Sequence, residues 1–226
     1  MRKIAVLVSI LALALSLLVT GCGDAKKTSS QTTPIDTGAG KELQVTNVQV
    51  VPNAFESTSS KAVTVAFKVT NPYKDYCSYN TYVKVNLLDS QGKIVGTEDG
   101  CIWNVYPGSR WHYFAGITSV GDPAKVETKP NSQSWIKIAP TKIPKATITQ
   151  STQSGSHVVG TLKFEGSSAP GEIEIKGVTL DANGNVNNYG VTQIMHPTVG
   201  DNPFDLSFFL GNIAGQPELS IELIQE

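Results

Sequence analysis

An internal repeat constrains the fold of this chain more than any other feature. Residues 63–69 carry an apolar side chain at every second position, which is the period of a strand with one buried face. Residues 158–164 follow the same pattern, with a glycine at one apolar position. Residues 83–93 and 175–185 form a second matching pair, because each has a strand-like run that ends in Asp-x-x-Gly. Such self-similarity indicates two copies of one structural unit.

The two Asp-x-x-Gly motifs, Asp89 to Gly92 and Asp181 to Gly184, predict tight turns. An aspartate side chain accepts hydrogen bonds from backbone amides across such a bend, and glycine takes the positive φ that the turn needs. The turns are roughly 90 residues apart, about the size of an immunoglobulin-like domain. Calcium binding, with the acidic pair at 98–99, is the alternative, although no oxygen-rich loop of the calcium-binding type is present.

The rest of each half also predicts strands. After its turn, each half has another strand, a Pro/Gly break, an aromatic strand and a short alternating strand, and no long segment has a helical apolar stripe. The sequence therefore predicts an all-β chain with two tandem immunoglobulin-like antiparallel β-sandwiches. The first spans residues 43–140 and the second 141–226, with Pro140 and Pro144 at the boundary.

This order of strands and turns resembles the FxLYD domains of bacterial lipoproteins and surface proteins. The stretches that carry the resemblance are Val85-Asn86-Leu87-Leu88-Asp89 and Gly177-Val178-Thr179-Leu180-Asp181. Both lack the first Phe and the Tyr of the family pattern. The resemblance implies an immunoglobulin-like sandwich in the cell envelope, with no catalytic residues to transfer.

The first 42 residues predict export and a lipid anchor. Arg2 and Lys3 precede an uncharged apolar run that ends in small residues, which is the layout of a secretory signal peptide. The run ends in Val19-Thr20-Gly21-Cys22, which resembles the lipobox of bacterial lipoproteins and implies cleavage after residue 21 and lipid on Cys22. An uncleaved transmembrane helix is the alternative, but the run is near the lower length limit for a membrane span. Residues 22–42 are rich in Ser, Thr, Gly and Lys and are predicted to comprise the lipidated cysteine and a flexible tether.

Two cysteines, Cys77 and Cys101, remain beyond the anchor. Outside the cytoplasm an even pair favours a disulfide over free thiols. If Leu88 faces Lys93 across the hairpin, Cys101 lies near Asn80, close enough to Cys77 for a bulge or loop to close the gap. Two buried free cysteines are the alternative.

Aromatic residues gather in the first half, around these cysteines. The group comprises Tyr73, Tyr76, Tyr79, Trp103 and Tyr106. Packing in a sandwich core is one interpretation. A surface for sugar rings or for a protein partner is the other, because rigid aromatic side chains give contact area at low entropic cost.

No catalytic or metal-binding constellation is recognisable. The three histidines are far apart, and Gly-x-Ser-x-Gly, P-loop and Rossmann patterns do not occur. Removal of residues 1–21 leaves a formal charge of about −3 without a basic block, which argues against nucleic-acid binding.

The sequence therefore predicts a non-enzymatic lipoprotein that needs no cofactor. Lipid on Cys22 would hold it at the extracytoplasmic face of the cell membrane, where it mediates protein interaction, adhesion or assembly. Binding of a glycan or solute by the first-half aromatics is the alternative, and an envelope hydrolase is less favoured.

Overall fold

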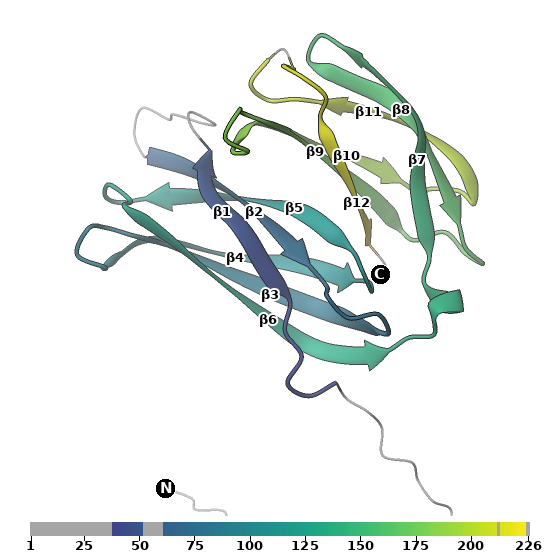
Figure 1. Ribbon diagram of the computed structural model, residues 1–226, viewed down its shortest axis with the longest axis horizontal. Coiled ribbons are helices and arrows are strands. Elements are labelled where there is room, and N and C mark those ends of the chain that lie inside the picture. Colours follow the sequence, from purple (N-terminus) through teal and green to yellow (C-terminus); the bar gives the residue numbers. More distant parts are fainter. Residues whose placement is uncertain (1–37, 52–60, 212, 225–226) are drawn as a thin grey trace, which may run out of the picture. The chain divides into compact units, whose positions relative to one another are not determined.

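The computed structural model describes residues 38–51, 61–211 and 213–224 (Figure 1). This part of the chain contains twelve strands, one short 3-10 helix, η1 (Pro140–Lys142), and no α-helix. The predicted all-β fold is confirmed. Within the described residues, no helix has the length and apolar character needed to cross a membrane. The predicted signal peptide, Cys22 and most of the predicted tether lie outside the described residues.

The first sandwich contains strands β1 (Gln44–Val51), β2 (Lys61–Thr70), β3 (Tyr76–Leu88), β4 (Ile94–Val105), β5 (Arg110–Ser119) and β6 (Lys125–Lys137). They form two antiparallel sheets with the strand orders β1-β2-β5 and β4-β3-β6, labelled in Figure 1. The apolar positions of β2 and β3 alternate into the core between the sheets. Their fully buried members are Val65, Phe67, Val69, Val83, Val85 and Leu87.

The second sandwich contains β7 (Lys145–Ser154), β8 (His157–Glu165), β9 (Glu172–Leu180), β10 (Val186–Met195), β11 (Gly200–Ser207) and β12 (Glu218–Ile224). Its antiparallel sheets have the orders β11-β8-β7 and β10-β9-β12. Every strand pairing of the first sandwich recurs here: β1–β2 as β7–β8, β2–β5 as β8–β11, and β3 with β4 and β6 as β9 with β10 and β12. The sequence repeat is thus a repeat of topology.

The two Asp-x-x-Gly motifs form the β3–β4 and β9–β10 turns. Asp89 Oδ1 accepts hydrogen bonds from the amides of Gln91 and Lys93, both at 2.9 Å. Asp181 Oδ1 accepts the two equivalent hydrogen bonds from the amides of Asn183 and Asn185, both at 2.8 Å. Gly92 and Gly184 have φ values of 81° and 82°, a region that L-residues rarely adopt. The aspartate oxygens are therefore used to hold the turns.

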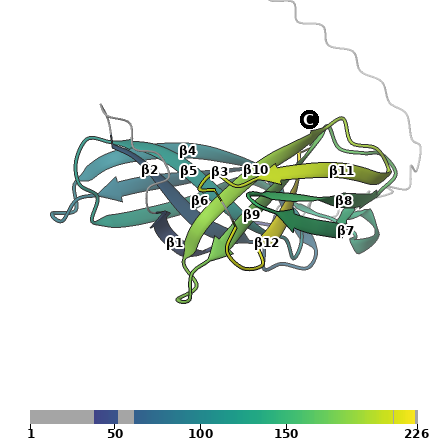
Figure 2. The same cartoon turned by 90° about the horizontal axis from the view of Figure 1, so that it is seen from above.

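The two sandwiches share buried contacts and belong to one unit of the chain, Ile35–Glu226. Strands β9, β10 and β12 lie beside β1, β4 and β5, and this can be followed in Figures 1 and 2. Val51 and Ala66 of the first sandwich share an apolar cluster with Val178 and Tyr189 of the second. The Phe114 ring stacks on the Tyr189 ring with the centroids 4.4 Å apart. This apolar seam joins the outer faces of two sheets.

Candidate functional site

Tyr73 and Tyr76 hold the segment around Lys41 and Glu42 against the first sandwich. Tyr76 is buried in the core, and the Tyr73 ring meets the Trp135 ring edge to face at 5.3 Å. Lys41 Nζ lies 3.9 Å from the centroid of the Tyr76 ring and 5.4 Å from that of Tyr73. The Glu42 amide donates a hydrogen bond to the Tyr73 hydroxyl. The packing interpretation therefore fits these two residues better than an open ligand surface.

A buried asparagine that the sequence did not single out fixes the loop between β2 and β3. Asn71 Nδ2 donates hydrogen bonds of 2.7 Å to the carbonyl oxygens of Tyr76 and Val105. Its Oδ1 accepts one of 3.0 Å from the Tyr73 amide. The side chain thus ties the start of β3 to the end of β4, directly before Tyr106.

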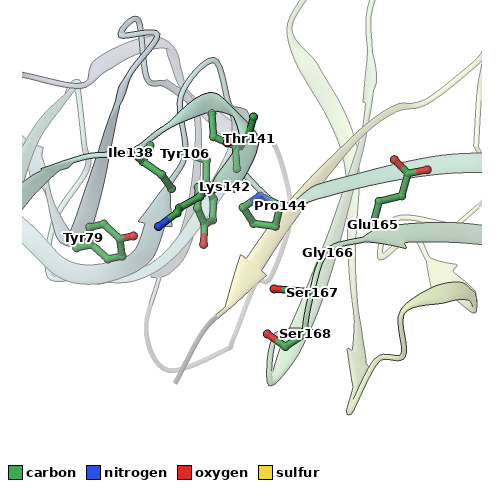
Figure 3. A pocket seen from close by; sticks show the side chains of 11 residues that line it. Tyr79, Tyr106, Ile138, Thr141, Lys142, Pro144, Glu165, Gly166, Ser167 and Ser168 are labelled. Carbon is green, nitrogen blue, oxygen red and sulfur yellow. The ribbon is translucent and has the colours of Figure 1, made fainter.

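Tyr79 and Tyr106 line a pocket at the junction of the two sandwiches, here called the junction pocket (Figure 3). Its volume is about 570 Å³. Tyr79 belongs to β3, and Tyr106 follows β4. The remaining lining comes from Ile138, residues 141–144 around η1, and residues 165–168, which run from the last residue of β8 into the loop after it. Trp103 lies in β4, and its side chain is outside the described part of the structure.

The junction pocket offers neutral hydroxyl groups. Burial, together with the neighbouring Cys77, raises the pKa of Tyr79 to about 12. Burial also raises the pKa of Tyr106, which is only 5% exposed. Both phenols stay protonated at neutral pH and can donate and accept hydrogen bonds. Lys142 and Glu165 add one positive and one negative charge to the lining.

The predicted disulfide between Cys77 and Cys101 is wrong for this fold, since both thiols are free. Cys101 pairs with Tyr82, which is five residues beyond Cys77 on β3 and therefore roughly 16 Å away along the strand. A disulfide needs Cα atoms within about 7 Å. The side chains also enter different surroundings: Cys77 packs with the second sandwich's core, and Cys101 lines a cleft near Glu222.

We expect mass analysis without reductant to find both Cys77 and Cys101 alkylated in the denatured protein. In the native protein Cys77 should react far more slowly than in the denatured one. Burial raises the pKa of its thiol to about 12, so almost no reactive thiolate is present near pH 8. Recovery of a peptide pair joined through these two cysteines would contradict the strand register.

A second cleft, here called the charged cleft, surrounds Lys176 of β9. Lys176 Nζ lies 2.6 Å from Glu174 Oε1 and 2.7 Å from Glu222 Oε2. Burial acts to lower the pKa of Lys176, but Glu222 and Glu174 overcome it, so this pKa lies above its usual value. Glu172 and Cys101 contribute to the lining of the cleft, whose volume is about 530 Å³. Burial, then the charges of Glu174 and Glu222, raise the pKa of Glu172.

An exposed Ser–His–Asp group occurs on β8 and β11, but its geometry differs from that of a catalytic triad. Asp205 Oδ1 lies 2.8 Å from His157 Nδ1, and Ser207 Oγ lies 3.2 Å from the same nitrogen. In a triad the carboxylate and the nucleophile use opposite ring nitrogens, so the imidazole can relay a proton. Here the serine and the carboxylate share one nitrogen. This group therefore gives no support to the hydrolase alternative.

Metal ligation has no support in the described segments 38–51, 61–211 and 213–224. They contain no group of three or more His, Cys, Asp and Glu side chains that could hold a metal ion.

Comparison with known proteins gives neither a matching family model nor a matching curated protein. The resemblances to FxLYD domains and to the lipobox therefore stay predictions.

Proposed function

We propose that this chain is a lipid-anchored, non-enzymatic binding protein of the bacterial cell envelope, which mediates protein interaction, adhesion or assembly. The observation that carries the proposal is the buried seam between the sandwiches. A seam of apolar and charged contacts makes the pair one scaffold, and a rigid scaffold can present its loops and edges to a partner at low entropic cost.

Polar contacts reinforce the apolar seam. Glu218 Oε2 lies 3.6 Å from Lys68 Nζ and 3.4 Å from His112 Nε2. The His112 amide donates a hydrogen bond to Ser220 Oγ at 3.4 Å. Lys176 Nζ lies 5.4 Å from the centroid of the Tyr113 ring. Strands β2 and β5 are thereby held to β9 and β12.

The sequence motif Val19–Cys22 supports the location at the membrane. Lipid with two or more acyl chains gives stable attachment, because each buried methylene contributes about 0.8 kcal/mol. The resemblance to FxLYD domains supports the envelope role and the lack of catalysis.

Cys22→Ser tests the anchor. We expect the unchanged protein in the membrane fraction, with mass analysis of its amino terminus showing acylated Cys22. We expect the variant to leave that fraction and enter the soluble fraction, because the acyl chains supply the attachment. Serine is close to cysteine in size, but the lipid-transfer reaction requires the thiol. Cys101→Ser is the matched control and should remain in the membrane fraction.

The binding role is tested by chemical cross-linking in the native membrane, followed by capture of the chain. A specific set of envelope proteins should be recovered with the unchanged protein and reduced with Cys22→Ser. An unlipidated, full-length chain in the cytosol would overturn the anchor. Lipidation with no cross-linked partner would overturn the role in adhesion or assembly.

A further inference from the structure

We propose that the junction pocket binds a neutral, hydroxyl-rich ligand of the saccharide class. This inference deepens the proposed function and rests on it, because the cell envelope is where the protein would meet the saccharide. Of the aromatic residues in the first half, it assigns ligand binding to Tyr79 and Tyr106 alone, which pack against the second sandwich.

The pocket has the size and the chemistry of a small-molecule site. Its volume of about 570 Å³ is within the usual range of roughly 300–1,000 Å³. Tyr79 supplies a half-buried aromatic ring, both tyrosines supply neutral hydroxyls, and Ile138 and Pro144 add apolar surface. A sugar presents both an apolar C–H face and several hydroxyl groups, so this combination of apolar and hydroxyl groups suits it.

Hydroxyl groups stand on two sides of the pocket. Figure 3 shows Tyr79 and Tyr106 on one side, with Ser167 and Ser168 across from them on the loop after β8. Hydroxyls of both kinds can donate and accept, as the hydroxyls of a sugar do. A ligand between them would contact both sandwiches at once.

The charge of the lining favours a neutral ligand over a strongly charged one. Lys142 and Glu165 have opposite signs and leave no net charge among the lining residues. The two phenols are protonated at neutral pH, as a tyrosine ordinarily is, and burial raises both pKa values further above that range. Neither a phosphate nor a polyamine would find a cluster of opposite charge here.

The walls of the pocket differ in rigidity, which suits ligand capture. Tyr106 is 5% exposed and belongs to the core cluster of the second sandwich, so it is a fixed wall. Ser167 and Ser168 are exposed on a loop and can adjust to a ligand. A fixed aromatic wall lowers the entropy lost on binding.

The experiment titrates the full chain, purified in detergent, with glucose, galactose, N-acetylglucosamine and disaccharides of each. Glutamate and lysine serve as charged comparison ligands. Saturable binding is measured by saturation-transfer NMR and calorimetry. We expect at least one neutral sugar to bind and to raise the melting temperature, and neither amino acid to do so. Saturation by the charged ligands alone, or by no ligand at millimolar concentration, would overturn the proposal.

Two variants locate the binding. Tyr79→Phe keeps the ring and removes the hydroxyl, and it should weaken sugar binding by about 3- to 10-fold, the value of one neutral hydrogen bond. Ser168→Trp fills the pocket from an exposed loop and should abolish binding. The control is Tyr82→Phe, on the same strand but 45% exposed and outside the pocket, which should bind as the unchanged chain does. Equal affinity in all three variants would place the ligand elsewhere and contradict the proposal.

The outcome is independent of the anchor. If the native chain proves to carry no lipid but binds sugar, the proposed membrane anchor is contradicted and the pocket assignment stands. A lipidated chain that binds none of the sugars would do the reverse.

Discussion

Replacing Lys176 by alanine is expected to lower the free energy of unfolding by about 3–5 kcal/mol, the usual cost of removing one partner from a buried ion pair. The side chains of Lys176, Glu174 and Glu222 are 9%, 15% and 4% exposed. Without the ammonium group, the two largely buried carboxylates would stay close together with no compensating charge between them. Urea unfolding measures the loss as a lower midpoint with an unchanged slope.

Lys125→Ala is the matched control for that variant. Lys125 Nζ also lies 2.7 Å from a carboxylate oxygen, that of Glu127, but the two side chains are 67% and 50% exposed. An exposed pair contributes about 0–1 kcal/mol. The double variant Lys176→Ala/Glu222→Ala should lose less unfolding free energy than the sum of the losses in the two single variants. The reason is that the second substitution removes one of the carboxylates that the first leaves unpaired. Equal losses for Lys176→Ala and Lys125→Ala would contradict the assignment of a buried ion pair.

The alternation of residues 63–69 and the Asp89 and Asp181 turns were enough to predict an all-β chain of two sandwiches. These signals are local, since alternation marks a half-buried strand and Asp-x-x-Gly marks a turn. Strand β7 was not assigned, because it lies at a sheet edge and most of its residues are exposed. An edge strand that buries few side chains leaves a weak pattern in the sequence.

The disulfide prediction failed on strand register. The sequence suggested Leu88 opposite Lys93, whereas the structure pairs Leu88 with Ile94 and has a bulge between Leu87 and Leu88. Cys101 consequently faces Tyr82 instead of a position near Asn80. Each residue of register moves a side chain by about 3.3 Å and reverses its face.

The candidate sites depend on contacts between the sandwiches, and a single sequence does not report these. Alternation along β9 puts Glu172, Glu174 and Lys176 on one face, but it does not reveal that β5 packs against that face and helps to bury Lys176. The aromatic cluster of the first half did include Tyr79 and Tyr106. The sequence gives no sign that Ser167 and Ser168 line the same pocket, because nearly ninety residues separate them from Tyr79 in the chain.

Asn71→Ala is expected to lower the free energy of unfolding by about 3 kcal/mol. Asn71 is 1% exposed, and its side chain satisfies the carbonyls of Tyr76 and Val105 and the amide of Tyr73. Alanine would remove all three of these hydrogen bonds, two of them buried, at about 0.5–1.5 kcal/mol each. Asn131→Ala, at an exposed position of β6, should change stability by less than about 0.5 kcal/mol.

Asn71→Asp separates the hydrogen bonds from the shape of the side chain. Aspartate fills nearly the same volume, but an ionised carboxylate has no donor for the two carbonyl oxygens that Asn71 Nδ2 contacts at 2.7 Å. Its unfolding midpoint should fall at least as far as that of Asn71→Ala. Because Val105 precedes Tyr106, sugar binding should weaken in both variants while they remain folded. Wild-type stability in Asn71→Asp would mean that the amide donors do not hold β3 to β4, and that the alanine variant is weakened by its cavity alone.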